Sequence, residues 1–460
     1  MSVEEIDHLL MEIDALTAVS NQSSNNHDGS FCDLLASASL VHSTNHTERL
    51  LEMEDASAFP EFVASNLQLT EVLSPVPYLW QEFLGCVIPG ITLDGKDPDN
   101  QVARHLASKA PGIPSLYSAL LFLSHSVQSN WVESSQARSD WNDVAATAYI
   151  MEQEAFSYVS KAILRASTIL VTQNQHMILL SILVTLCSAY IARDNMEALT
   201  FCLESAIKLV HTGFTLEIST DETFLFLVRW IGYIHTLSML GETPYQLAAP
   251  DYLTIAKSDE DYMTNNPSTF FRDVDSFLGA SQAVADILYR VGISLRSVDS
   301  NESCSQDSLG CHLVDAELRI ELLARKLAQF KQEHGALESS IDLYNEALVH
   351  TAWLVILMGP RQVSCHSTLA LSTIGKILDS CAAVSVSAPV AKLMLLPMFV
   401  AGSWTQRPVY QSFIRQRFEA LSSGHCIVNV HRTLEVLEER WAARRRGESS
   451  EGEFRAVIIR

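Results

Sequence analysis

The stretch LMLLPMFVAGSW, from Leu393 to Trp404, is almost wholly apolar but has a proline at its fifth position. Proline inside a helix removes a backbone hydrogen bond and clashes with the preceding turn, at a cost of about 3 kcal/mol. Pro397 therefore predicts a kink or the start of a new helix. The pair Ala401 and Gly402 has room for another backbone to approach closely, and the glycine favours a turn of the chain.

The residues after this stretch predict two further helices. The first begins near Pro408 and ends just before Gly424, and Asn429 can cap the second. Apolar side chains follow a helical period in both segments, at Tyr410, Ile414, Phe418 and Leu421 in the first and at Val430, Leu434, Leu437 and Trp441 in the second. We expect the two helices to pack behind the segment that contains Pro397.

The rest of the chain from about Tyr78 onward is also helical in pattern, and alternating strand patterns are scarce. A helix from Leu313 to about His334, ended by Gly335, has a seam that lasts under three heptads, so internal packing is favoured over a dimer zipper. The seam consists of Leu313, Ala316, Ile320, Leu323, Leu327 and Phe330. Polar loops are expected at 296–308 and 258–268. The predicted fold class is all-α, a multi-helix regulatory domain with a disordered acidic N-terminal tail.

The acidic tail is the most distinct part of the sequence. The first sixty residues hold eleven acidic side chains and one basic one, Arg49, a composition typical of disorder. Within it, one helical face could dock into a partner's groove. That face consists of Val3, Ile6, Leu9, Leu10, Ile13 and Leu16. The predicted organisation is a tail at 1–75, an all-helical domain at 76–446 and a C-terminal tail at 447–460.

Charge and hydropathy exclude several classes of protein. The formal net charge is −23, and a phosphate backbone favours proteins with clustered Lys and Arg, so we expect no direct binding to nucleic acid. The longest run without Asp, Glu, Lys, Arg or His, Met177 to Ala192, has 16 residues, short of the roughly 20 that span a bilayer. It predicts a buried core helix, and we expect no membrane association.

The cysteines and acidic residues give no clear catalytic or metal-binding pattern. Nine dispersed cysteines indicate reduced thiols, and no Cys-x-x-Cys occurs. Cys304, Cys311 and His312 come nearest to a metal signature but form an incomplete ligand set. The acidic cluster at 259–261 lacks the spacing with which paired carboxylates hold magnesium, and phosphate-loop, dinucleotide and nucleophile-elbow motifs are missing. We therefore predict no cofactor and no catalytic site.

The opening stretch and its sequel resemble the C-terminal signature of the fungal-specific transcription factor domain, the regulatory region of fungal zinc-cluster transcription factors. That pattern is an apolar Pro-hydrophobic-Phe-x-Ala-Gly segment, a helix with arginines, a Gly-containing break, Asn-Val, and a helix ending in Trp. In this chain the features fall on Pro397, Phe399, Ala401, Gly402, Arg415, Gly424, Asn429, Val430 and Trp441. The segments at 78–91, 115–127 and 224–240 are similar to the family's opening and central helices.

This resemblance implies a nuclear transcription-regulatory protein rather than an enzyme, and structural roles for the signature residues. A full regulator of the family has six N-terminal cysteines that hold zinc and place a helix on DNA, whereas the first seventy residues here contain only Cys32. We therefore expect action through protein partners or an unknown small effector. A DNA-binding regulator is one candidate partner, and a homo-oligomer stays open. Arg444 to Arg446 are a candidate import signal, although a basic cap on the helix C-terminus also explains them.

Two other interpretations remain. One is an all-helical enzyme or ligand-binding protein of secondary metabolism, which convergent acids or a base inside a pocket would distinguish. The other is a truncated gene model of a complete zinc-cluster factor, which a six-cysteine segment encoded upstream would reveal.

Overall fold

The computed structural model describes residues 75–91, 100–132, 148–157, 159, 172–215, 221–240, 270–271, 274, 279–299, 306–424 and 430–447. This described part is helical, with one isolated antiparallel bridge between Val274 and Ser281. The all-α prediction is confirmed. The stripe from Val3 to Leu16, the acidic cluster at 259–261 and the C-terminal tail from 448 onward lie outside the described residues, and the predicted domain boundaries stay predictions.

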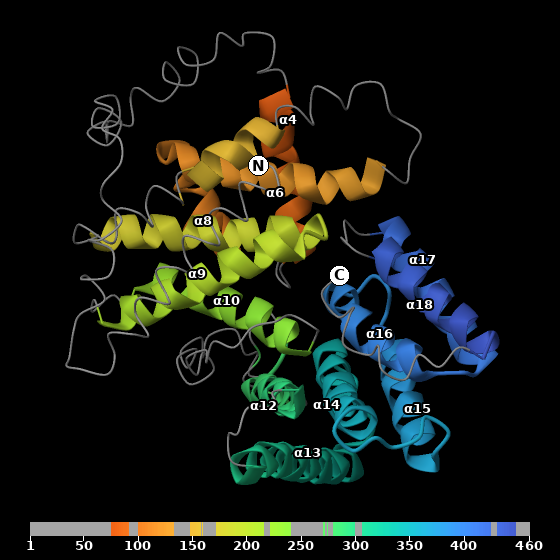
Figure 1. The fold of residues 1–460 in the computed structure, drawn as a ribbon. Helices are drawn as coiled ribbons and strands as arrows, with labels where there is room; N and C mark the ends of the chain where they lie inside the picture. The colour runs from red at the N-terminus through yellow and green to blue at the C-terminus, as the bar shows by residue number, and fades with distance from the viewer. Residues whose placement is uncertain are drawn as a thin grey trace.

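The helices form two groups, each made of consecutive helices of the chain (Figure 1). The first group is α4 (Pro75–Glu82), η4 (Phe83–Val87), α5 (Ile88–Ile91), η5 (Ala103–Ala107), η6 (Ala110–Gly112), α6 (Pro114–Val132), α8 (Gln173–Ala192), α9 (Met196–Thr215) and α10 (Glu222–Leu240). The second group is α12 (Gln282–Asp299), α13 (Gln306–His334), α14 (Ser340–Met358), α15 (Thr368–Ala383), η8 (Pro389–Met394), α16 (Leu395–Trp404), α17 (Pro408–Gly424) and α18 (Val430–Arg445).

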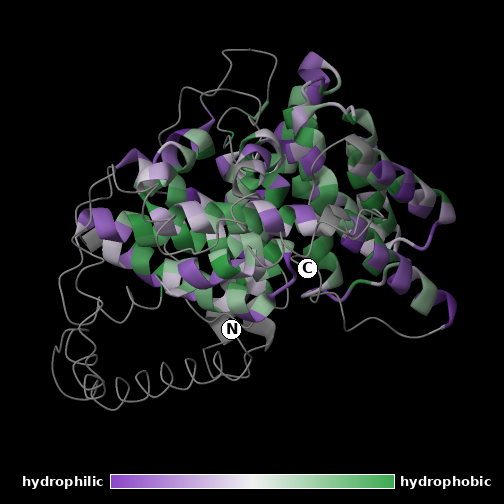
Figure 2. Ribbon diagram, turned by 90° about the horizontal axis from the view of Figure 1, so that it is seen from above, coloured by the Kyte–Doolittle hydropathy of each residue, from purple (hydrophilic) through white to green (hydrophobic). Residues whose placement is uncertain are grey.

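Each group encloses its own hydrophobic core, and α10 takes part in both. The N-terminal part of α10, from Phe224 to Ile234, is buried in the first core, whereas Leu240 is buried in the second. Leu237 packs against both cores. Figure 2 shows hydrophobic residues gathered where the helices meet and hydrophilic ones on the outer turns. Helix α10 therefore packs in both halves and connects their cores.

The long apolar helices α8 and α10 are core helices, and for α8 the sequence predicts this. By length and composition alone, α8 and α10 could each cross a membrane, and 72% of the apolar window of each is buried inside the structure. Helix α8 begins with a capping box, in which Thr172 Oγ1 accepts from the backbone of Gln175 and the Gln175 side chain accepts from the backbone of Thr172. The run from Met177 to Ala192 lies entirely within α8.

Helix α13 confirms the predicted seam but begins earlier than expected. Ala316, Ile320 and Leu327 are buried against the second core, and Leu313, Leu323 and Phe330 are partly buried there. Gly335 ends the helix with φ +92°, a left-handed conformation that glycine adopts without steric cost. The polar loop predicted at 296–308 is wrong at both ends, because α12 continues to Asp299 and α13 starts at Gln306. Asp and Ser are favourable in the first turn of a helix, so at 307 and 308 they fit the start of α13 rather than a loop.

Candidate functional site

All signature residues except Asn429 lie on α16, α17 and α18, which pack together at one end of the second core (Figure 1). The 3-10 helix η8 leads directly into α16, and Pro397 is the third residue of α16. A proline fits there because the first backbone N–H groups of a helix have no partner within the helix. The prediction that Pro397 marks a helix start is confirmed.

Gly402 lies inside α16, so the predicted turn at Ala401 and Gly402 is wrong: the helix continues to Trp404. The close approach does occur, but to side chains rather than to a backbone. A Cβ atom at Gly402 would lie 3.0 Å from Leu437 Cδ1 of α18 and 3.2 Å from Ile414 Cδ1 of α17. The glycine therefore lets two neighbouring helices pack directly on α16.

Trp441 fastens α18 to the end of α16. Its indole Nε1 donates a 2.8 Å hydrogen bond to the carbonyl oxygen of Gly402, and both residues are buried. The last carbonyls of a helix have no intrahelical partner. Thr405 N donates to the Ala401 carbonyl at 3.0 Å, and Trp441 satisfies the next carbonyl along. Trp441, four residues before the end of α18, therefore caps α16.

Arginines from α17 and α18 cover the aromatic rings of the same region, in what we term the arginine–aromatic cluster. Its three pairs, with the distance from the guanidinium carbon to the ring centroid, are Arg415 over Trp441 at 4.9 Å, Arg440 over Phe399 at 5.5 Å and Arg444 over Trp404 at 5.3 Å. A guanidinium within about 6 Å of an aromatic centroid is attracted by the negative ring face. Each pair joins two of the three helices.

Two of these arginines also make polar contacts. Arg415 holds Glu438 through two contacts, one of them 2.9 Å between Nη2 and Oε2, and these hydrogen bonds lower the pKa of Glu438. Arg440 Nη1 donates to Ser403 Oγ at 3.0 Å. Arg415, Arg440 and Arg444 are therefore structural in this fold. Because Arg444 lies over Trp404, the side chains of the candidate import signal are not equivalent.

The structure places the remaining predicted residues as follows. Phe399, Ala401, Val430 and Trp441 are buried in the second core, and Pro397 is buried in α16. Gly424 is the last residue of α17 rather than the residue beyond it, and Asn429 lies outside the described residues. Sequence reasoning missed the partner arginines Arg440 and Arg444. Their spacing of four residues beside Trp441, which puts them on one helix face, is the signal that could have found them.

Other buried polar side chains connect neighbouring elements. Asp342 on α14 accepts from the backbone N–H groups of Phe270 and Phe271 at 3.0 and 2.9 Å. Asn345, one turn later, donates to the Gly279 carbonyl at 2.9 Å and accepts from Ser281 N. These bonds attach the chain that enters α12 to α14.

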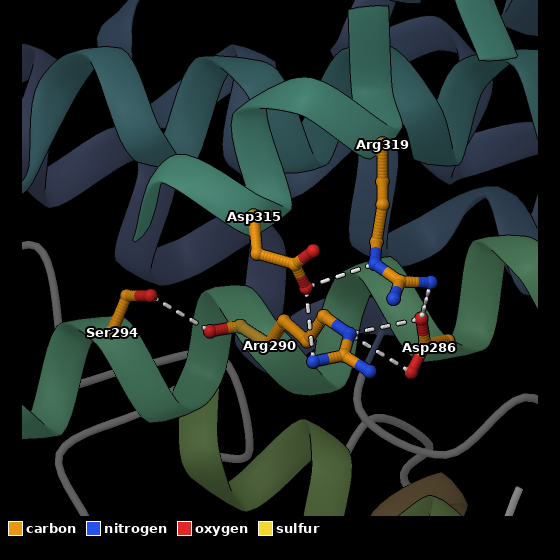
Figure 3. A network of polar contacts seen from close by, with 5 residues as sticks. All are labelled: Asp286, Arg290, Ser294, Asp315 and Arg319. Carbon is orange, nitrogen blue, oxygen red and sulfur yellow. Dashed lines mark hydrogen bonds and ion pairs between the residues drawn. The ribbon is translucent and has the colours of Figure 1, made fainter. Parts of the chain in front are cut away.

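A charged network joins α12 to α13 at the surface of the second core (Figure 3). Asp286 and Arg290 of α12 face Asp315 and Arg319 of α13. The contacts are Arg290 to Asp286 at 3.0 Å, Arg290 to Asp315 at 3.0 Å, Arg319 to Asp286 at 2.9 Å and Arg319 to Asp315 at 2.9 Å. Two acids and two bases neutralise one another in this network.

Buried histidines lie in the first core. His105 Nδ1 lies 3.1 Å from Thr223 Oγ1, which also accepts from Lys109 Nζ at 2.8 Å. Burial and then the charges of Arg104 and Lys109 lower the pKa of His105 to about 4. Burial, together with Arg193, lowers the pKa of His125 to about 4. Both side chains are therefore neutral parts of the core at neutral pH.

The cysteines and acids of the described residues form no cluster of three or more groups that could hold a metal ion. Cys187, Cys202 and Cys381 are buried free thiols, and burial raises the pKa of each. Cys304 lies outside the described residues, and Cys311 falls within α13. The site that the signature residues build is thus a structural joint of three helices.

Comparison with known proteins gives one match. A family model with the description "Fungal specific transcription factor domain" matches residues 78–457. The match takes in every helix from α6 to α18, including the joint around Gly402 and Trp441. No curated protein and no solved structure matches the chain.

Proposed function

Because the chain belongs to the fungal specific transcription factor domain family, we propose that these 460 residues regulate transcription through contacts with partner proteins, without a zinc cluster of their own. The family match over 78–457 is the observation that carries this proposal. Since the family is one of transcription factors, it also supports a nuclear location and a role other than catalysis. The resemblance read from the sequence is confirmed at the level of the family.

Charge and cysteine content support the protein-contact mode. The net charge of −23 opposes the approach of a phosphate backbone. A zinc cluster of this family needs six cysteines close together, and residues 1–74 contain Cys32 alone. Because contacts to DNA bases give sequence specificity, a chain that makes none cannot recognise a particular promoter. A partner that reads DNA would supply that choice.

The joint of α16, α17 and α18 fits a scaffolding role within this mechanism. Its aromatic rings and arginines are occupied with one another, and Gly402 and Trp441 are buried. These residues keep the second core rigid so that surfaces elsewhere can be presented to a partner. Their substitution should act through stability.

The contact surface that we propose is the apolar face from Val3 to Leu16, which lies outside the described residues. This segment has five acidic and no basic side chains among the apolar ones. Such a segment can fold as a helix when it enters a partner's groove. The apolar stripe would supply the affinity, and the acids would favour a partner with a basic rim.

The test is a triple replacement of Ile6, Leu9 and Ile13 by Ser in the full chain. We expect loss of nuclear co-purification with a DNA-binding regulator and loss of reporter output, while the helical domain keeps its thermal stability. The matched control is Ile6→Leu, Leu9→Met and Ile13→Leu, which keeps the stripe apolar and should keep both activities. Unchanged association and output in the Ser variant would eliminate this surface, and tight sequence-specific DNA binding by the isolated chain would eliminate the partner mechanism.

A further inference from the structure

The start of α17 lies beside the end of α18. Arg415 is seven residues from the start of α17, and it holds Glu438, seven residues before the end of α18. Only five residues join the two helices, so the helices are antiparallel and these two ends lie together (Figure 1). Arg444 over Trp404 also brings the last turn of α18 to the residues that lead into α17.

Three exposed arginines and one exposed apolar side chain gather at this place, which we term the arginine end. They are Arg407, Arg445, Arg446 and Val409, of which Val409 is 76% exposed. Within the described part of the chain, neither Arg407 nor Arg445 forms an ion pair. Glu438 of α18 is already held by Arg415. The arginine end therefore presents positive charge to solvent beside an apolar side chain.

Charge is distributed unevenly along the chain. Residues 405–447 hold eight arginines and four glutamates and neither Lys nor Asp, which gives this region a net charge of +4 in a chain of −23. The first 74 residues hold thirteen acidic side chains and one basic one. Exposed opposite charges attract one another over roughly 8 Å at physiological salt. The arginine end is therefore complementary in charge to the N-terminal residues.

The segment from Val3 to Leu16 matches both features of the arginine end. It has five acidic side chains, no basic one and an apolar stripe, so it can pair with the arginines and cover Val409 at the same time. A nucleic acid would be repelled by the net charge of −23, and its phosphates offer no apolar surface to Val409. Residues 17–74 join the segment to α4, and these 58 residues can extend to roughly 190 Å. Chain length therefore permits the contact within one molecule.

We propose that the arginine end is the docking site of the segment from Val3 to Leu16 of the same chain. The carboxylates of the segment pair with Arg407, Arg445 and Arg446, and its apolar stripe covers Val409. Exposed ion pairs are individually weak and screened by salt, so the contact is reversible. The regulatory consequence rests on the proposed function, in which the same segment enters a partner's groove. A docked segment cannot enter that groove, so the arginine end and the partner compete for it.

The test measures binding of a fluorescein-labelled peptide of residues 1–17 to the full chain by fluorescence anisotropy. The receptor chain carries Ile6→Ser, Leu9→Ser and Ile13→Ser, so that its own segment does not occupy the arginine end. We expect this chain to bind the peptide at least ~10-fold more tightly than the wild-type chain, whose own segment competes. Addition of NaCl to about 0.5 M should weaken the binding.

Charge reversal at the arginine end is the decisive change. Arg407→Glu with Arg445→Glu, added to the receptor chain, should weaken peptide binding at least ~10-fold. The matched control is Lys208→Glu with Lys326→Glu, which makes the same change of net charge at exposed positions of α9 and α13 and should leave binding unchanged. A charge-reversed peptide should bind the arginine-reversed chain more tightly than the control chain. That peptide carries Glu4→Lys, Asp7→Lys, Glu12→Lys and Asp14→Lys.

Other outcomes overturn the proposal. These are equal binding by the wild-type and Ser chains, or binding that the reversal of Arg407 and Arg445 leaves unchanged. Peptide binding that appears only after removal of residues 448–460 would assign the arginine end to the C-terminal segment instead. Labelled duplex DNA that binds the wild-type chain and not the arginine-reversed chain would assign it to nucleic acid.

Two further measurements keep the result clear. If circular dichroism shows that the arginine-reversed chain loses helix, Arg407→Gln with Arg445→Gln keeps helix propensity and must still weaken binding at least ~3-fold. The anisotropy assay contains no regulator, whereas the proposed function is tested by co-purification with one. Failure of the docking contact and failure of the proposed function are therefore distinguishable.

Discussion

Trp441→Phe is the most informative single change at the joint of α16 and α18. Phenylalanine keeps an aromatic ring but removes the Nε1 donor, which leaves the buried carbonyl of Gly402 without its 2.8 Å hydrogen bond. An unsatisfied buried acceptor costs about 1–3 kcal/mol. The smaller ring also loses packing, at roughly 0.8 kcal/mol for each methylene-sized group.

A further contribution comes from Arg415, whose guanidinium lies 4.9 Å from the Trp441 ring centroid. Cation–π pairs at partly exposed sites contribute about 0.5–1 kcal/mol, and tryptophan is the strongest partner. The three contributions together predict that Trp441→Phe destabilises the fold by at least about 3 kcal/mol. Urea unfolding followed by circular dichroism would measure this as a lower midpoint with an unchanged slope.

The matched control is Trp353→Phe on α14. Trp353 packs against the same core while partly exposed, so the same reduction in ring size should cost less there. The reasoning would be refuted if Trp441→Phe cost under about 1 kcal/mol, or no more than the control. Either result would mean that the hydrogen bond to Gly402 contributes little to stability.

Three other expectations follow from the described contacts. Burial holds the pKa values of His105 and His125 near 4, below an unfolded value of about 6.5. Their neutral forms therefore stabilise the fold above about pH 6.5, and this stability is lost as the pH falls toward 4. Urea midpoints at several pH values should decline over this window, and His105→Gln should reduce the decline; a flat profile would contradict it. Asp342→Ala should cost about 1–3 kcal/mol, because two backbone N–H groups lose their acceptor. Asp379→Ala, at an exposed position of α15, should change the urea midpoint little. Elemental analysis of the purified 460-residue chain should find no stoichiometric zinc, since its cysteines are dispersed, and two zinc ions per chain would show that distant residues assemble a site.

The sequence was most informative where the helical period of the apolar residues and the residues that start or end a helix agree. Pro408, the stripe from Tyr410 to Leu421 and the glycine at 424 together predict α17, and the structure places that helix at Pro408–Gly424. Likewise, Gly335 marks the end of α13. Such local signals work because capping, proline geometry and side-chain period all act within a few residues.

What the sequence could not give depends on contacts between distant residues. Gly402 favours a turn locally, but α17 and α18 pack on it and keep α16 helical. The bond from Trp441 to Gly402 spans 39 positions, and no local pattern encodes such a pair. The sequence also did not reveal that Val314, Leu318 and Leu322 of α13 are exposed, because an apolar residue on a second helix face looks the same in sequence whether it is covered or exposed.

The helix shared by the two cores gives the molecule a mechanical property. Helix α10, with 19 residues, contributes side chains to the first core and to the second. If one core unfolds, α10 therefore loses packing contacts on which the other core also depends. Strain introduced at one end is carried along that helix, because close-packed interiors resist compression. We therefore expect the two halves to unfold in one transition, and a partner that stabilises one core to stabilise the other as well.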